Sequence, residues 1–221
     1  MGKQWDKIFK KYGKVFTKPQ EDIPRIVKLF REKGVQRVLD LGCGSGRHAV
    51  HFAKYGFEVY GIDIAPIGIK MAKDWLKKDG LKANLKIGSV YKRLPYKDNF
   101  FDAVVSIQVI HHAEIKTIRK AIKEIERVLR PGGLIFITVR KRKLPQLRSI
   151  NKIFKGLSSE NIRDKIIGIR TSIPIEGEEK GLIHYLFNKD LLKKEFKDFK
   201  NLKIWPASYK KHYSLLGKLK K

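Results

Sequence analysis

The stretch Val38-Leu39-Asp40-Leu41-Gly42-Cys43-Gly44-Ser45-Gly46-Arg47 decides the fold of this chain. We predict a short buried strand over 36–41, a glycine-rich turn, and a helix over 45–55. The three glycines carry no Cβ, so they let the backbone turn sharply and let a ligand approach closely. The free N–H groups and the positive dipole end of the following helix point back at this turn. The sequence therefore predicts a site for a polar or anionic small molecule.

Two acidic residues sharpen this prediction. Asp40 ends the first strand two residues ahead of Gly42, where the dinucleotide-binding fingerprint of dehydrogenases has no acid. The third glycine of that fingerprint is also missing, because Arg47 stands in its place. A second strand, predicted over 57–62, is followed by Asp63, about 20 residues beyond the first glycine. A carboxylate at that point is placed to accept hydrogen bonds from both hydroxyls of a ribose.

Four segments together resemble the class I S-adenosylmethionine-dependent methyltransferases with a methyltransferase type 11-like domain. They are VLDLGCGSGRH (38–48), EVYGIDIA (58–65), LPYKDNFFDAVVSIQVIHH (94–112) and VLRPGGLIFIT (128–138), in the family's order and spacing. The resemblance implies an enzyme that transfers a methyl group from S-adenosyl-L-methionine, and it says almost nothing about the acceptor. It also implies a Rossmann-like α/β fold with a seven-stranded, mostly parallel sheet, an antiparallel edge strand, and helices on both faces.

The alternation of strand and helix patterns independently predicts right-handed crossovers and a doubly wound parallel sheet. Further helices are expected over 3–16, 20–33, 65–78, 115–129 and 189–199, the last capped by Asn188. Further strands are expected over 84–88, 102–107, 134–139, 201–205 and 212–219. The last two of these would form an antiparallel pair at the sheet edge.

The predicted cofactor contacts lie in the glycine turn and at the ends of strands. They are Asp40, Gly42, Cys43, Gly44, Asp63, Ile64, Ser89, Val90 and Gln108. By the resemblance, Asp40 orients the glycine loop and the methionine amino group, and Asp63 binds the ribose. Ile64 packs on the adenine, and Gln108 lies near the methionine end. Ser89 stands where the family commonly has an acid near the adenine amino group, so a serine oxygen or a backbone carbonyl replaces that acid.

Two adjacent histidines are the candidates for catalysis. His111 and His112 follow the strand over 102–107, and ligands of open parallel sheets bind just outside such strand ends. An imidazole titrates near pH 7, so we predict one of them as a general base. Adjacent side chains rarely point the same way, so we expect only one to face the pocket, and His111 alternatively only shapes its wall. His184, inside the apolar run 183–187, is a weaker candidate.

We predict structural rather than catalytic roles for the other reactive side chains. His48 and His51 lie three apart on a helix with no third ligand nearby, so we interpret them as surface or edge residues and predict no metal site. Cys43, the single cysteine, excludes an internal disulfide and is typical of a reducing cytoplasm. We interpret it as a small residue that fills a tight loop. No apolar run is long enough to span a membrane, so we expect no membrane partner.

We predict a single domain with four parts. They are an N-terminal helical flap over 1–35, a cofactor-binding core over 36–139, a variable basic lid or substrate segment over 140–187, and a final helix with edge strands over 188–221. The first helix either packs on the domain edge or covers the cofactor. The basic segment over 140–170 has helical stretches, and residues 176–181 are expected to form an exposed loop.

The net charge of +28 is unusual, with 50 lysines and arginines against 22 acids. Few methionines and many lysines suggest a thermophile, but such proteins usually gain glutamate together with lysine. Residues 38–139 contain 17 basic and 10 acidic residues, so most of the excess lies outside the core. We therefore give equal weight to two kinds of methyl acceptor. One is an anionic acceptor such as RNA, for example a tRNA, and the other is a small metabolite. The non-enzymatic alternative is a partner protein that binds cofactor or nucleic acid without transferring a methyl group.

Overall fold

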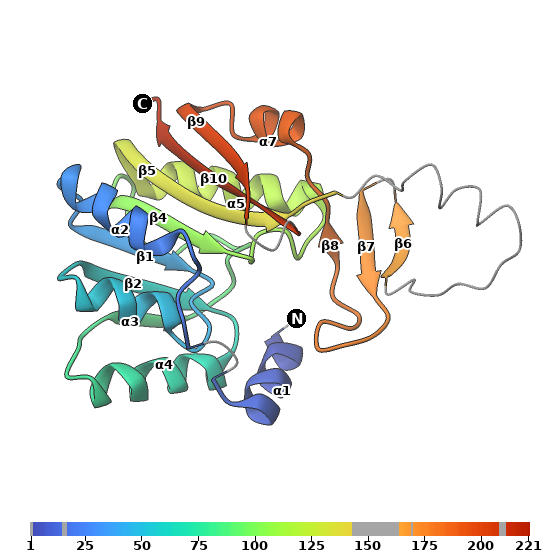
Figure 1. Cartoon of the computed structure of the whole chain (residues 1–221), viewed down its shortest axis with the longest axis horizontal. Coiled ribbons are helices and arrows are strands. Elements are labelled where there is room, and N and C mark those ends of the chain that lie inside the picture. Colours follow the sequence, from blue (N-terminus) through green and yellow to red (C-terminus); the bar gives the residue numbers. More distant parts are fainter. Residues whose placement is uncertain (1, 15–16, 143–163, 169, 208–210) are drawn as a thin grey trace, which may run out of the picture.

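A seven-stranded sheet forms the centre of the protein (Figure 1). Its strands are β1 (Arg37–Leu41), β2 (Glu58–Asp63), β3 (Asn84–Ile87), β4 (Phe101–Ile107), β5 (Leu129–Arg140), β9 (Phe199–Pro206) and β10 (His212–Leu219). Their spatial order is β3-β2-β1-β4-β5-β10-β9. The computed structural model describes all residues except 1, 15–16, 143–163, 169 and 208–210.

Strands β1 to β5 run parallel, and β10 runs antiparallel to both of its neighbours. The predicted doubly wound, mostly parallel sheet with an antiparallel pair at one edge is therefore confirmed. All seven residues of β4 are buried, because helices cover both faces of this central strand. In the register of β1 with β2, Asp40 lies opposite Gly61 and Leu41 opposite Ile62, so both strands end at one edge of the sheet.

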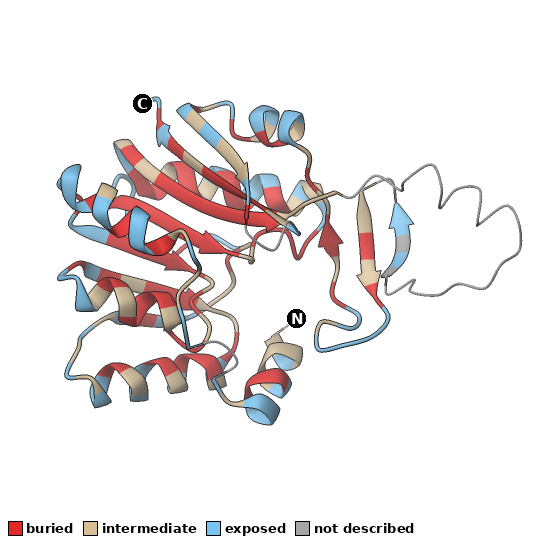
Figure 2. Ribbon diagram, viewed as in Figure 1, coloured by how far each residue is buried: buried red, intermediate tan, exposed pale blue. Residues whose placement is uncertain are grey.

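Helices cover the two faces of the sheet in separate layers, and their inward sides are buried (Figure 2). They are α1 (Gly2–Tyr12), α2 (Ile23–Glu32), α3 (Arg47–Lys54), α4 (Pro66–Lys78), α5 (Ile115–Val128) and α7 (Lys189–Glu195). Residues of α2, α3 and α4 share one hydrophobic cluster, and residues of α5 and α7 belong to the other. The expected cap of α7 is confirmed, because Asn188 Oδ1 accepts a hydrogen bond from the Leu191 N–H at 3.0 Å.

A second, three-stranded antiparallel sheet was not predicted from the sequence. It consists of β6 (Asp164–Gly168), β7 (Thr171–Pro174) and β8 (His184–Tyr185). The expectation of helical stretches over 140–170 is therefore wrong for the residues of β6, and residues 143–163 lie outside the described part. Strand β8 is fixed to the core, because the Tyr185 N–H donates to the His111 carbonyl at 2.7 Å. Phe187 continues this attachment by pairing its backbone with Arg140 and Arg142 of the core.

No helix in the described part of the chain has both the length and the apolar character needed to cross a lipid bilayer.

The carboxylate of Asp22 ties the N-terminal region to the last two strands. It accepts hydrogen bonds from the Ser214 hydroxyl at 2.8 Å and from the Trp205 indole N–H at 3.1 Å. Arg25 donates to its other oxygen at 2.9 Å. The Asp22 side chain is only 13% exposed, so these bonds are partly shielded from water. One carboxylate therefore connects the start of α2 with β9 and β10.

We predict that Asp22→Ala lowers the free energy of unfolding by about 2–3 kcal/mol, because the Ser214 and Trp205 donors lose their charged acceptor. Urea denaturation of wild type and variant measures this difference. Asp74→Ala is the matched control, since its exposed pair with Lys70 contributes less than about 0.5 kcal/mol. Equal effects of the two substitutions would show that the Asp22 contacts do not stabilise the fold.

Candidate active site

The glycine turn after β1 adopts backbone conformations that only glycine tolerates easily. Gly42, Gly44 and Gly46 have φ angles of 87°, 51° and 93°. A Cβ on Gly42 would lie 2.3 Å from the Val109 side chain, and one on Gly46 would lie 2.7 Å from the Ala72 Cβ. The turn is therefore closed against its neighbours at the carboxyl edge of the sheet.

Asp63, at the end of β2, holds this turn in place. Its Oδ2 accepts a hydrogen bond from the Gly44 N–H at 2.8 Å, and its Oδ1 accepts one from the Ala65 N–H at 2.9 Å. Burial raises the pKa of this carboxyl group, while the N–H groups of Ala65, Gly44 and Ile64 oppose that shift. Each carboxylate oxygen can accept a further bond, so Asp63 can also hold two hydroxyl groups of a ligand.

Asp40 lies beneath the turn and is almost fully buried. Neither of its carboxylate oxygens has a hydrogen-bond partner among the described residues. Burial raises its pKa to about 7, Arg47 opposes the shift, and the charge of Asp63 adds to it. A buried carboxyl group without partners is costly, and such groups concentrate at functional sites. Asp40 does not line the cavity described next, so only the turn above it faces that cavity.

A cavity of about 760 Å³ opens at this edge of the sheet. The predicted site residues that line it are Gly42, Cys43, Gly44, Asp63, Ile64, Ser89, Val90, Gln108 and His112. Helix α1 contributes Trp5, Ile8 and Phe9, so it covers the cavity as well as packing on α4. Both interpretations of the first helix therefore describe the same contact. The loop after β7 forms the opposite wall of this cavity.

Two predicted contacts are positioned by the backbone around them. Gln108 has a backbone φ of 61°, which is uncommon for a residue other than glycine. Its N–H donates a hydrogen bond to Thr138 Oγ1 at 2.9 Å. The Ser89 hydroxyl accepts a hydrogen bond from the Tyr91 N–H at 3.2 Å, while the Tyr91 hydroxyl donates to the Val109 carbonyl at 3.0 Å. Both Gln108 and Ser89 thus reach the cavity wall from ordered loops.

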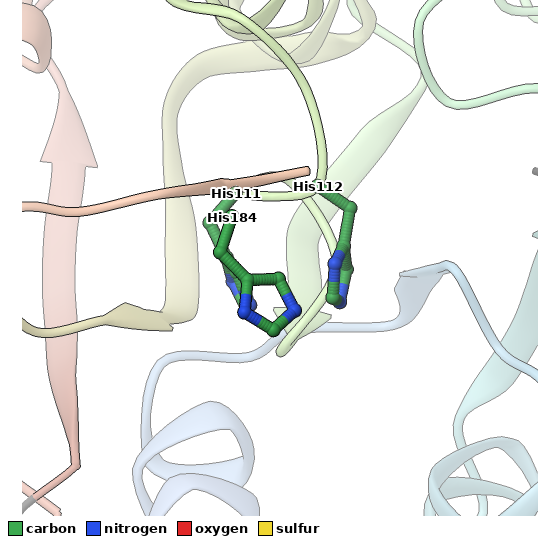
Figure 3. A group of neighbouring side chains, drawn as sticks. All are labelled: His111, His112 and His184. Atoms are coloured by element: carbon green, nitrogen blue, oxygen red, sulfur yellow. The ribbon is translucent and has the colours of Figure 1, made fainter. Parts of the chain in front are cut away.

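The candidate catalytic histidines lie against a third one (Figure 3). The ring centroids of His111 and His112 are 4.2 Å apart, and those of His112 and His184 are 4.8 Å apart. His112 lines the cavity, whereas His111 lies behind it, as the expectation of a single pocket-facing ring requires. Burial lowers the pKa of His112 to about 4 and that of His111 well below its usual value. Both rings are therefore neutral at pH 7.

Sequence reasoning missed Glu179, which lies in the loop expected to be exposed. Its side chain is 35% exposed and lines the cavity, with Oε2 at 3.2 Å from His184 Nε2 and Oε1 at 3.9 Å from His112 Nε2. The loop is exposed as expected except at Glu179, which the docking of β8 on the His111 carbonyl brings against the core. Spacing along the chain gives no signal of this contact, since the two segments are far apart in sequence.

The interpretation of His48 as a surface or edge residue is wrong. Its side chain is buried, and its Nε2 accepts a hydrogen bond from the Gln20 N–H at 3.2 Å, which links α3 to the segment before α2. His51 is half-buried at the outer side of the same helix. Cys43 is a buried free thiol whose pKa burial raises well above the usual value, so it packs the loop rather than reacting.

Comparison with known proteins agrees with this geometry. Residues 39–137 match the family described as a methyltransferase domain. This match supports an S-adenosylmethionine-dependent methyltransferase core. The cofactor of this family is S-adenosylmethionine. A solved structure with a related fold contains a bound form of this cofactor. Magnesium protoporphyrin IX methyltransferase from Synechocystis PCC 6803, solved with bound S-adenosylhomocysteine, has a TM-score of 0.63 at 16% identity over 90% of this chain and 83% of its own.

Curated relatives of this methyltransferase domain act on different acceptors. Norajmaline N-methyltransferase of Rauvolfia serpentina is 41% identical over 108 residues, which cover 48% of this chain and 36% of that protein. Ribosomal RNA small subunit methyltransferase C of Alcanivorax borkumensis is 27% identical over 135 residues, 59% of this chain and 40% of that protein. The chain thus spans well under half the length of these relatives. The similarity therefore covers only part of each protein.

We predict that Asp40→Asn stabilises the protein without ligand at high pH. The folded-state pKa is about 7 and the unfolded value about 3.9, so the cost of ionising Asp40 in the fold appears above about pH 4 and is complete above about pH 7. At pH 8 the variant should gain on the order of 2–3 kcal/mol of unfolding free energy, and at pH 4 almost nothing. Urea denaturation at the two pH values measures the difference. An equal loss of stability at both would contradict the buried-charge explanation.

Proposed function

We propose that this protein is an S-adenosylmethionine-dependent methyltransferase whose acceptor is a small molecule. The observation that carries the proposal is the cavity covered by α1, whose lining includes both the glycine turn with Asp63 and the pair His112 and Glu179. Its volume of about 760 Å³ lies in the usual range for small-molecule sites. Helix α1 lies over it and limits how large an acceptor can enter.

The residues at the glycine end fit the cofactor. The carboxylate of Asp63 faces the cavity and has capacity for the two ribose hydroxyls, and Ile64 and Val90 offer apolar surface to the adenine. The unpartnered carboxyl group of Asp40 favours a nearby cation, which the amino group of the methionine part supplies. When bound, the cofactor supplies an electrophilic methyl group. The protein's tasks are then to orient the two reactants and to exclude water.

The other end of the cavity suits an acceptor with an apolar body and a polar group. Trp5 and Tyr91 provide apolar and aromatic surface, while Arg140 and Glu179 provide charges of opposite sign. We assign His112 as the residue that contacts the acceptor, because it lines the cavity. Its ring packs edge-to-face with Trp5 at a centroid distance of 5.7 Å. His111, behind it, is a positioning residue.

RNA is the second candidate acceptor, and the net charge of +28 favours it. The lysines and arginines beyond residues 38–139 would contact phosphates, and binding would weaken steeply with salt. The small-molecule proposal ranks first because the cavity is covered by α1 and because a polynucleotide must expose one base to reach it. For the location we propose the cytoplasm, since the single cysteine is a free thiol.

Transfer of labelled methyl from S-adenosylmethionine separates these acceptors. We predict that a deproteinised small-molecule extract becomes labelled when incubated with the wild-type protein, whereas total RNA purified from the same cells does not. The covered cavity is the physical reason. Label confined to the RNA fraction would overturn the small-molecule proposal and keep the methyltransferase one. No label in either fraction, together with no cofactor binding, would overturn both.

We predict that Asp63→Ala weakens S-adenosylmethionine binding at least about tenfold, because hydrogen bonds to a charged acceptor contribute about 1.5–3 kcal/mol each. Asp63→Asn should have a smaller effect, since one oxygen can still accept from the Gly44 N–H. Asp79→Ala, a carboxylate outside the cavity, is the matched control. Isothermal titration calorimetry measures all three. Unchanged affinity in Asp63→Ala would remove this residue from the ribose site.

A further inference from the structure

Three buried histidines meet at the wall of the cavity. His111 and His112 come from the loop after β4, and His184 comes from β8, about seventy residues later in the chain (Figure 3). One ring nitrogen from each can be chosen so that all three atoms lie within 4.8 Å of one another. Within the described ranges, no other group of three histidine, cysteine or acidic side chains comes together in this way.

The ring nitrogens of this cluster lack partners. Nδ1 of His111 and both nitrogens of His112 and His184 are buried and make no hydrogen bond of acceptable geometry with described residues. Buried polar atoms are nearly always hydrogen-bonded, and histidines that serve only packing satisfy at least one nitrogen. An acceptor lies near these nitrogens, the Glu179 carboxylate at 3.2 Å from His184 Nε2, and the cluster still has capacity for a shared ligand. A metal ion satisfies several imidazole nitrogens at once.

A carboxylate completes the donor set. Glu179 Oε2 lies 3.2 Å from His184 Nε2, and Oε1 lies 3.9 Å from His112 Nε2. Three imidazoles and one carboxylate are ligands that suit divalent transition metals rather than Mg²⁺ or Ca²⁺. The negative charge of Glu179 also offsets the guanidinium of Arg140, which lines the same end of the cavity.

We propose that His111, His112 and His184, with Glu179 as a fourth ligand, bind one divalent first-row transition metal ion. In a tetrahedral site with bonds of about 2.1 Å, neighbouring nitrogens lie about 3.4 Å apart, so the longest edge of the cluster, at most 4.8 Å, shortens by up to about 1.4 Å when the ion binds. The hydrogen bond from the Tyr185 N–H to the His111 carbonyl already holds the two contributing segments together. Small ring rotations therefore suffice.

The location of the site suggests what the ion does. His112 and Glu179 line the cavity, so a fifth coordination position, which the ion gains by expanding from four to five ligands, would face the acceptor end. There the ion would bind and polarise a hydroxyl or carboxylate oxygen of the acceptor, which favours its deprotonated form. This consequence rests on the proposed function, whereas metal binding itself does not.

Titration of the chelator-treated, full-length protein with Zn²⁺ alone tests the proposal. We expect isothermal titration calorimetry to give one ion per chain with Kd below about 1 μM, and no comparable binding of Mg²⁺. His184→Gln and Glu179→Gln should each weaken Zn²⁺ binding at least about tenfold. His51→Gln removes a histidine outside the cluster and is the matched control, which should bind as wild type does. The visible absorption of bound Co²⁺ reports imidazole ligation independently of activity.

Two results would overturn the metal site. One is a wild-type protein that binds neither Zn²⁺ nor Co²⁺ tighter than about 100 μM, a test that needs no variant. The other is Zn²⁺ affinity unaffected by Glu179→Gln, whose partly exposed loop position makes misfolding a poor explanation. Unchanged methyl transfer after removal of the ion would overturn its role in polarising the acceptor and would leave metal binding itself standing. Metal binding without S-adenosylmethionine binding would overturn the proposed function alone.

Discussion

The hydrogen bond from the Gly44 N–H to the Asp63 carboxylate joins the two strand ends on which the cavity depends. The parallel register of β1 and β2 brings these ends together, and the N–H groups of Gly42 and Cys43 both reach the Ile62 carbonyl. The left-handed conformations of the glycines make this approach possible. Every other feature of the cofactor end, including the cover by α1, is built on this contact.

Several groups at the same edge of the sheet lower the stability of the folded state. Asp40 is buried without partners, Asp63 is largely buried, and Gln108 has a backbone conformation that is uncommon for its residue type. Their cost is offset by the continuous apolar packing of the central strands and by contacts such as that of Asp22 with β9 and β10. Such a distribution of strain is what a preorganised ligand site requires.

The elements of the core could be predicted because their signals are local. The glycines, the acid at each strand end and the apolar stripe of α5 are each signalled by neighbouring residues, and the doubly wound parallel sheet follows from the alternation of elements. The burial of His48 and the contacts of Glu179 and His184 depend instead on segments that meet only in the folded chain. Whether the cofactor and acceptor residues act as assigned stays a prediction.

A crystal structure of the protein with S-adenosylhomocysteine tests the central claim most directly. We expect the ribose hydroxyls on the Asp63 carboxylate, the adenine against Ile64 and Val90, and the amino acid end over the turn above Asp40. That arrangement would point the sulfur toward His112 and the acceptor end of the cavity. A nucleoside bound elsewhere, or no binding at millimolar concentration, would contradict the assignment of this cavity as the methyl-transfer site.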